Sequence, residues 1–393
     1  MTTTTVRWPL APSPSIHHPS PELTRLRETE PVAPVTMPDG SRAWLVTRHA
    51  DVRTVLTDPR FSRALASRAQ PGEEIGSLTA DSLIGMDPPR HTRLRRLVNR
   101  AFTPRRVEGL RPWVAGLVDR LVDDLVAAGR PADLVRHVSM PLPIEVISEL
   151  FGLPEADRPH CKAWSDALMG GHNDPPAARA AMAGFARVIE SRRAHPGDDL
   201  TTALIQARDE HGALSGDELL GMAVGILVGG HESTTQLVNL SLLTLLRFPA
   251  ELARLRADLT LLPGAVEELL RFVQIGDTGV LPPRVTTEPV TLAGVDLPAG
   301  AFVMCAFVTA NRDPAVFADP DRLDLTRHPN PHLGLGVGIH YCLGGPLAVL
   351  ELEETLRALL TRLPALTLAV PERDLRFTPG LAVRSLAGLP VTW

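Results

Sequence analysis

The feature that most constrains the fold is a long apolar stretch from Asp217 to Arg247. It is apolar on nearly every side of a helix, which predicts a long helix buried on most of its faces. Phe248-Pro249 is expected to end it, because proline cannot continue a helix. Each glycine inside such a helix costs about 1 kcal/mol relative to alanine. A packing or functional reason is therefore expected at Gly221, Gly225, Gly229 and Gly230.

Composition narrows the class of protein. The chain has 393 residues, 44% of them hydrophobic and 22% charged, with a net charge of −5. These values are typical of a folded globular protein, exclude disordered and fibrous chains, and indicate no nucleic-acid partner. Cys161, Cys305 and Cys342 are widely spaced, which argues against a zinc ribbon or a disulfide framework. Neither a secretory signal nor an apolar run of about 18 residues is found, so we expect a cytoplasmic protein without a membrane partner.

The remaining pattern predicts a mainly α fold with a small β region. No internal repeat or linker divides the chain, so we expect an extended arm over residues 1–20 and a single domain over residues 21–393. Pro38-Asp39-Gly40 and Asp58-Pro59 bound a first strand and helix. The pattern predicts strands at 43–46, within 284–308 and within 366–393; helices at 49–56, within 90–129, at 143–152, 158–169, 264–272 and 346–363; and coil at 66–85 and 315–340.

One cysteine lies in a setting suited to chemistry. Cys342 sits in the glycine-rich segment 336–346, directly before a predicted helix. Glycines let backbone N–H groups approach one atom, and a helix N-terminus favours negative charge. Both effects stabilise a thiolate. The residues alone leave open a structural cysteine, a metal ligand and a nucleophile, the last needing a base for which His340 is the nearby candidate.

Polar residues also interrupt the long apolar helix at 229–234. Glu232 and Ser233 are costly there unless they are satisfied, and a serine can bond back to a carbonyl one turn away. A satisfied polar patch is the plain alternative. His231-Glu232 begins like a zinc motif, but Thr235 stands where the second histidine would be, so that interpretation fails.

Two further pairs are spaced for one helix face. Glu268 and Arg271 are three residues apart and can form an ion pair, which by itself is usually a surface pair. His91 and Arg95 are four apart and suit a ligand with two anionic groups. The plain alternative for the second pair is a solvated basic helix.

Taken together, these segments resemble the cytochrome P450 family. Residues 335–344 match its bacterial haem loop, Phe-Gly-x-Gly-x-His-x-Cys-x-Gly, except that Leu335 replaces the phenylalanine. The resemblance implies the cytochrome P450 fold, haem b as cofactor, and Cys342 as the axial thiolate on iron. Glu268 and Arg271 match the structural Glu-x-x-Arg of the family. Segments 86–89 and 310–314 support the match.

The resemblance also implies roles for other residues. Glu232 and Ser233 would deliver protons for oxygen activation, with Ser233 in place of the usual threonine; Thr234 is a weaker stand-in, since it lies about 100° further round the helix. The haem propionates would be bound by His91, Arg95, Arg284 and His340. By family position the substrate pocket would include Ser82, Val228, Gly229 and Leu281, with Gln70 and Asp277 as further polar residues.

The expected function is a monooxygenase acting on a mid-sized, largely apolar natural product such as a macrolide or polyketide. The alternatives are an oxidative coupling enzyme for a cyclic dipeptide or aromatic alkaloid, and a haem-binding protein without turnover. The chain contains no dinucleotide fingerprint or multi-cysteine cluster, so electrons are expected from a ferredoxin with its reductase. The protein is expected to be a monomer. A basic docking surface is predicted at Arg93, Arg96, Arg100, Arg105 and Arg106.

Overall fold

The computed structural model describes most of the chain as two compact units. The described residues are 6–11, 13, 17–69, 82–99, 102–155, 157, 158, 160, 161, 163, 164, 175–209, 214–273, 275, 280–378 and 385–393. The first unit comprises Met1–Ala69 and Arg247–Cys342, and the second comprises Gln70–Leu246 and Leu343–Trp393. Each unit therefore combines two separate segments of sequence. The prediction of one domain over residues 21–393 stays a prediction.

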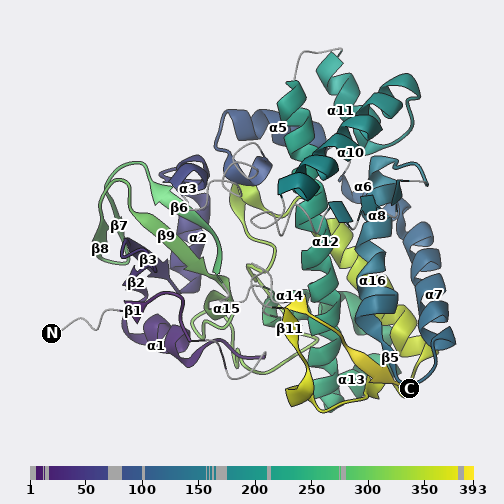
Figure 1. Ribbon diagram of the computed structural model, residues 1–393. Coiled ribbons are helices and arrows are strands. Elements are labelled where there is room, and N and C mark those ends of the chain that lie inside the picture. Colours follow the sequence, from purple (N-terminus) through teal and green to yellow (C-terminus); the bar gives the residue numbers. More distant parts are fainter. Residues whose placement is uncertain are drawn as a thin grey trace. The chain divides into compact units, whose positions relative to one another are not determined.

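The first unit is organised around a six-stranded sheet (Figure 1) with strand order β1-β2-β3-β9-β6-β4. The neighbours β3 and β9 are parallel, whereas β2 and β6 run antiparallel to β3 and β9 respectively. A separate hairpin joins β7 and β8. The strands span Val6–Arg7 (β1), Val32–Thr36 (β2), Arg42–Val46 (β3), Phe61–Ser62 (β4), Val280–Thr286 (β6), Val290–Leu292 (β7), Val295–Leu297 (β8) and Phe302–Ala306 (β9).

Short helices complete this unit because their apolar residues recur every three or four positions and are buried. Leu23 and Leu26 of α1 pack in a cluster with Leu45, and Val52 and Val55 of α2 pack with Val303. The helices are α1 (Pro21–Thr29), α2 (His49–Thr57), α3 (Arg63–Ala69), α13 (Pro249–Ala257), α14 (Leu262–Phe272) and α15 (Phe307–Ala310), with 3-10 turns at Leu259–Leu261 and Gly338–His340.

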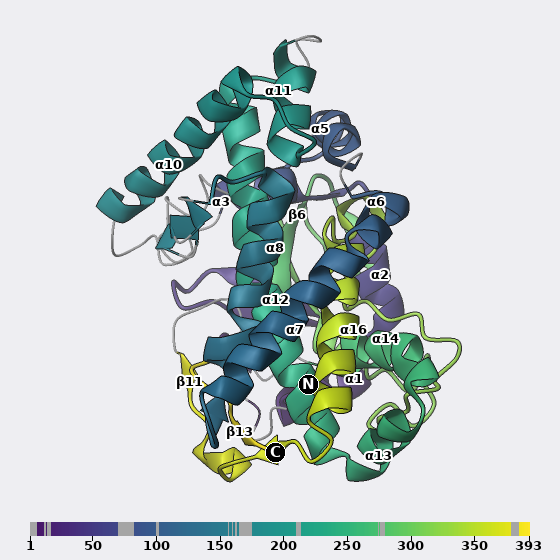
Figure 2. The same ribbon diagram turned by 90° about the vertical axis from the view of Figure 1, so that its right-hand side faces the viewer.

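The second unit is mainly helical and contains the long helix α12 (Figure 2). Helix α16 packs along α7, where Arg111 forms ion pairs of 2.9 Å with Glu353 and 2.5 Å with Glu354. The helices are α5 (Arg90–Asn99), α6 (Pro104–Gly109), α7 (Arg111–Ala127), α8 (Pro141–Phe151), α10 (Pro175–Ala194), α11 (Leu200–Asp209), α12 (Gly216–Arg247) and α16 (Gly345–Arg362), with a 3-10 turn at Leu83–Gly85 and a π-helical turn at Val135–Ser139.

The start of α12 is fixed by reciprocal capping. The backbone N–H of Ser215 donates to Glu218 Oε2 at 3.0 Å, and the backbone N–H of Glu218 donates to Ser215 Oγ at 3.1 Å. Glu218 Oε1 also pairs with Arg90 at 3.1 Å and with Arg93 at 2.6 Å. The cap thereby ties the beginning of α12 to α5.

Two glycines of α12 have the packing reason that the sequence analysis expected. A Cβ added at Gly225 would lie 3.0 Å from Ser82 Cβ, and one added at Gly230 would lie 2.9 Å from Ile147 Cδ1. At Gly229, by contrast, an added Cβ would meet nothing within 4 Å. Packing therefore accounts for glycine at two positions, whereas nothing in the structure explains it at Gly229.

The chain tail forms small sheets in the second unit. Strand β13 (Pro390–Thr392) lies between β10 (Thr367–Leu368) and β5 (Ala132–Asp133), and β11 (Phe377–Thr378) pairs with β12 (Ser385–Leu386). A 3-10 turn spans Glu372–Asp374. Within the described part of the chain, no helix is long and apolar enough to cross a membrane.

Most predicted elements are confirmed, including the mainly α class with a small β region. The predicted coil at 66–85 was wrong at both ends, because α3 reaches Ala69 and a 3-10 turn begins at Leu83; residues 70–81 lie outside the described residues. The predicted start of the helix near Pro143 was two residues late, since Pro141 occupies the first turn of α8. Helices α1, α3, α10, α11, α13 and α15 were not predicted.

Candidate active site

The loop that carries Cys342 is held by its own backbone. The N–H of Cys342 donates to the carbonyl of Leu335 at 2.8 Å, which closes the loop around residues 336–341. The N–H of Tyr341 donates to the carbonyl of Gly338 at 3.1 Å, within the 3-10 turn. The Cys342 side chain is exposed. The sulfur therefore sits on a loop with a defined shape and remains accessible.

Glycine is required where this loop meets its own unit. A Cβ at Gly334 would lie 2.2 Å from the carbonyl oxygen of Leu270 in α14. Gly338 has φ +76°, and a Cβ there would lie 2.9 Å from the carbonyl oxygen of Leu56 in α2. The loop thus rests directly on the backbone of two helices, an approach that any side chain would prevent.

The other two cysteines are poor candidates for chemistry. Cys161 and Cys305 are both buried. Burial raises the pKa of the Cys305 thiol to about 12 and that of Cys161 to about 11. Both thiols stay neutral at physiological pH, so among the three cysteines only Cys342 combines exposure with a glycine-rich loop.

Three more predicted site residues belong to the first unit. Arg284 lies on β6 opposite Val303 of β9, with its side chain buried. His340 ends the 3-10 turn two residues before Cys342 and is half-buried. Leu281 lies on β6 opposite Cys305 in the strand register, but its side chain is outside the described part of the chain.

In the second unit, Glu232 and Ser233 lie in the middle of α12. Ser233 Oγ donates to the carbonyl of Gly229 at 2.6 Å, the bond to a preceding turn that the sequence analysis considered. Glu232 is half-buried, and its Oε1 accepts hydrogen bonds from Ser385 at 2.5 Å and from Gln236 at 3.0 Å. Thr234 is buried, whereas Ser233 is half-buried, so the two hydroxyls do not share one environment.

The predicted pocket residues of this unit cluster along α12. Val228 and Gly229 occupy the turn before Glu232, and Val228 is half-buried while Gly229 is exposed. Ser82 packs against the same helix one turn earlier, at Gly225. Gln70 and Asp277 lie outside the described residues.

His91 and Arg95 lie on α5, one turn apart. His91 is buried, and its pKa is lowered, first by burial and then by the nearby Arg95 charge, with Asp87 opposing the shift. The Nε of Arg95 donates to Asn99 Oδ1 at 2.9 Å. A neutral imidazole and a permanent cation therefore share one region of the helix.

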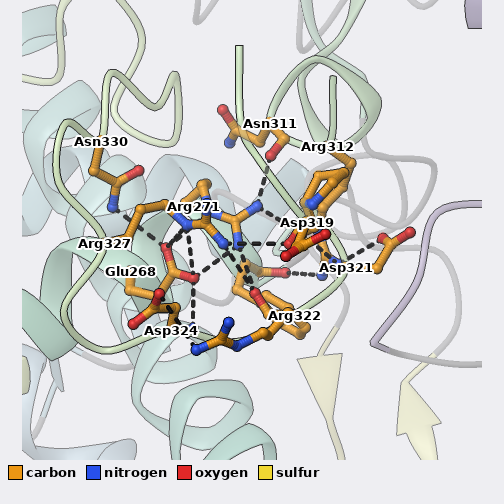
Figure 3. A network of polar contacts seen from close by, with 12 residues as sticks. Glu268, Arg271, Asn311, Arg312, Asp319, Asp321, Arg322, Asp324, Arg327 and Asn330 are labelled. Atoms are coloured by element: carbon orange, nitrogen blue, oxygen red, sulfur yellow. Dashed lines mark hydrogen bonds and ion pairs between the residues drawn. The ribbon is translucent and has the colours of Figure 1, made fainter. Parts of the chain in front are cut away.

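The Glu268–Arg271 pair is a fully buried network rather than a surface ion pair (Figure 3). Both side chains are 0% exposed, and both guanidinium–carboxylate contacts measure 2.8 Å. Arg327 joins from the coil, with its Nε 3.2 and 3.1 Å from the two oxygens of Glu268. Arg271 also donates to the carbonyls of Asn311 at 2.9 Å and Pro320 at 2.8 Å. The network thus fastens α14 to the coil at 311–330.

A second buried arginine extends this network. Arg312 donates to Asp321 at 2.9 Å and to the carbonyls of His17 at 2.9 Å and Phe272 at 3.1 Å. Burial, together with the like charge of Arg271, lowers the pKa of Arg312 to about 10. Arg312 thereby connects the N-terminal segment to the end of α14.

Comparison with known proteins places these features in a family. The family model "Cytochrome P450" matches residues 184–382. The chain is 45% identical over 373 residues to mycinamicin IV hydroxylase/epoxidase of Micromonospora griseorubida, covering 94% of each chain. It is 45% identical to cytochrome P450 monooxygenase PikC of Streptomyces venezuelae, covering 95% of this chain and 91% of that one. The crystal structure of the LnmA cytochrome P450 hydroxylase of Streptomyces atroolivaceus superposes with a TM-score of 0.90 at 42% identity, covering 99% and 100% of the two chains.

The chain therefore belongs to the cytochrome P450 family, and its cofactor is haem b. The residues of the first unit fit such a group. An exposed thiol on a loop closed by backbone hydrogen bonds would serve as a thiolate ligand of iron, and Arg284 and His340 would supply cations or hydrogen-bond donors of the kind that bind carboxylates. In the second unit, His91 and Arg95 offer the same chemistry.

Three residues that contact the predicted acids Glu268 and Glu232 were not predicted from the sequence. Arg327 lies 59 residues from Glu268 in proline-rich coil, and Ser385 lies 153 residues from Glu232, so no local spacing could have indicated either contact. Gln236 carried a signal, because it stands four residues after Glu232 on the same helix face. A buried polar residue one turn from a candidate acid is a cue that could have identified it.

Proposed function

We propose that this protein inserts one oxygen atom from dioxygen into a mid-sized, largely apolar natural product of the macrolide or polyketide type. The observation that carries the proposal is the exposed Cys342 thiol on its closed glycine-rich loop. The named relatives, a mycinamicin IV hydroxylase/epoxidase and a P450 monooxygenase, support the reaction class. The substrate class rests on the first of these names and on the mostly apolar segments predicted to line the pocket.

Each residue of the candidate site has a proposed role in this reaction. Haem, when bound, would supply the activation of dioxygen, and Cys342 would supply the thiolate that holds its iron. By the family resemblance, Arg284, His340, His91 and Arg95 would bind the propionates. Glu232 and Ser233 would hold and pass on protons, since a carboxylate and a hydroxyl at neighbouring positions can form a relay.

We propose that the electrons come from a ferredoxin with its reductase. Of the predicted docking cations, Arg93 is paired with Glu218 and Arg106 with Asp198 at 2.8 Å, while Arg100 lies outside the described residues. Arg96 and Arg105 are exposed on α5 and α6. We therefore narrow the docking proposal to these two cations. A monomeric state and a cytoplasmic location stay predictions.

Oxidative coupling and haem binding without turnover are the less favoured functions. The relatives named above are a hydroxylase/epoxidase and a monooxygenase, and these names favour oxygen insertion over either alternative. Isotopically labelled dioxygen distinguishes all three. Purified holoprotein with NADPH, ferredoxin and reductase is first screened for a substrate-induced spin-state shift of the haem, with macrolides, cyclic dipeptides and aromatic alkaloids as probes.

The labelled turnover then decides between the functions. Oxygen insertion predicts one labelled atom in the product, with the second atom released as water. A product that has lost two hydrogens and gained no label would identify coupling instead. Consumption of NADPH no faster than in the absence of every probe, with no product, would contradict any monooxygenase function on these compounds.

Ser233 provides a more specific prediction. Replacing Ser233 with Ala removes the hydroxyl that donates to Gly229, and we expect the fraction of electrons recovered in product to fall about tenfold or more. Ser233→Thr keeps the hydroxyl and adds a methyl that restricts its rotamers, so its coupling should equal or exceed that of the parent. Product and hydrogen peroxide per NADPH are the measurements. Equal coupling in the alanine variant would remove Ser233 from the relay.

A further inference from the structure

The carboxylate of Glu232 is hydrogen-bonded to Ser385, a residue near the end of the chain that belongs to none of the family motifs. Its Oε1 accepts a hydrogen bond from the Ser385 hydroxyl at 2.5 Å. Ser385 lies on β12, and its side chain is 3% exposed. A buried hydroxyl from the tail of the chain thus reaches the one carboxylate in the middle of α12.

The same strand supplies a second connection. The backbone N–H of Leu386 donates to Gln236 Oε1 at 2.9 Å, and Gln236 Nε2 donates to Glu232 Oε1 at 3.0 Å. The donor character of the Leu386 amide fixes which end of the Gln236 side chain faces β12. Its NH2 group must then face Glu232. Both hydrogen bonds to the carboxylate therefore depend on β12. Ser385 donates to it directly, and Leu386 orients the Gln236 amide that donates to it.

This arrangement restricts the glutamate side chain. A glutamate has three rotatable bonds, and a half-buried one samples several staggered rotamers unless contacts select one. Here two donors converge on the same oxygen, Oε1, which selects a single orientation and leaves Oε2 as the other acceptor. Gln236 is 1% exposed and cannot reorient freely.

From these contacts we infer that Ser385 is a positioning residue that orients the Glu232 carboxylate for proton delivery, with Gln236 as its accessory. The inference rests on the proposed role of Glu232. In this proposal Ser385 acts through Glu232 and takes no part in the reaction itself. Its loss leaves the acid in place but in several orientations, so more reducing equivalents leave as hydrogen peroxide: NADPH, a proton and dioxygen yield NADP+ and hydrogen peroxide.

The test compares four variants of the holoprotein. Ser385→Ala removes the hydrogen bond, Ser385→Thr retains a hydroxyl, and Glu232→Gln removes the acid. Thr378→Ala is the matched control, since Thr378 stands opposite Ser385 in the β11–β12 ladder and its side chain is exposed. The readouts are product per NADPH, the solvent isotope effect on product formation, and the infrared carboxylate stretch that disappears in Glu232→Gln.

The expected pattern is specific to positioning. Ser385→Ala should lower product per NADPH about five- to tenfold, less than Glu232→Gln does, and should move the carboxylate band to higher wavenumber. Ser385→Thr should restore both, and Thr378→Ala should match the parent. The infrared band reports the hydrogen bond independently of turnover.

The other outcomes distinguish an error in the proposed role of Glu232 from an error in the inference on Ser385. If Glu232→Gln couples as well as the parent, the proposed proton-delivery role of Glu232 is wrong, and the inference falls with it. If Glu232→Gln loses coupling but Ser385→Ala keeps both the parental coupling and the parental band, only the inference on Ser385 is overturned. A loss in Ser385→Ala that Ser385→Thr does not restore also overturns it, because that pattern indicates a packing defect.

Discussion

Replacing Glu268 with Gln is expected to prevent haem-loaded protein from accumulating. The substitution removes the one carboxylate that binds both Arg271 and Arg327, and it leaves two buried cations facing a neutral amide. Breaking a buried ion pair by removing one partner costs about 3–5 kcal/mol. A typical domain has only about 5–15 kcal/mol of stability, so a large part of that stability is lost.

The measurement is the yield of haem-containing protein per total chain, from the Soret absorbance of material expressed in parallel. Glu267→Gln is the matched control, because Glu267 is the preceding residue of α14, half exposed, and pairs with His332 at 2.8 Å near the surface. We expect the control to retain at least most of the parental yield and Glu268→Gln less than about a tenth of it. Equal yields in the two variants would show that the network does not stabilise the fold.

The second large effect is a dependence of the protein's stability on pH, which arises from Glu351. This residue of α16 is 3% exposed, and its Oε2 has no hydrogen-bond partner among the described residues. Burial raises the pKa of its carboxyl from 4.5 to about 8. The carboxyl therefore stays protonated in the folded protein up to about pH 8, whereas the unfolded chain releases that proton above about pH 4.5.

The sign of the effect follows from linkage. Between about pH 4.5 and 8 the folded state holds one more proton than the unfolded state, so stability falls as the pH rises through this window. Glu351→Gln mimics the neutral acid at every pH. We expect the variant to match the parent near pH 4.5 and to be more stable at pH 8.5 by about 2–4 kcal/mol.

Thermal unfolding of the holoprotein at both pH values checks this expectation, with the apparent midpoint as the readout. Glu155→Gln is the control, since Glu155 is exposed and should change the midpoint little at either pH. A stability gain that is the same at low and high pH would show that the effect is not protonation. A loss at both would show that Gln does not fit the site.

How far the sequence predicted this structure depended on how local each signal is. The apolar run at 217–247 predicted both ends of α12 to within one residue. A sequence that is apolar on nearly every side over this length is typical of a buried helix. The proline at position 346 correctly marked the first turn of α16. Helices α1, α3, α10, α11, α13 and α15 were not predicted.

In the candidate site, too, the local features could be predicted from the sequence and the long-range contacts could not. The cysteine loop and the pair Glu268–Arg271 are contiguous motifs, and their geometry follows from spacing over a few residues. The contacts of Arg327 with Glu268 and of Ser385 with Glu232 join segments 59 and 153 residues apart. Such contacts depend on tertiary packing, which a sequence pattern cannot specify. For the same reason the burial that shifts the pKa of Glu351 could not be anticipated from its place in the chain.

The central claim is that the Cys342 sulfur is the axial ligand of haem iron, and the carbon monoxide difference spectrum of reduced holoprotein tests it most directly. The parent and Cys161→Ala, which alters a buried thiol whose pKa is raised to about 11, should both give the red-shifted Soret band that defines thiolate-ligated haem. Cys342→Ala should lose that band and all oxygen insertion. A Cys342→Ala protein that retained the thiolate band would contradict the account.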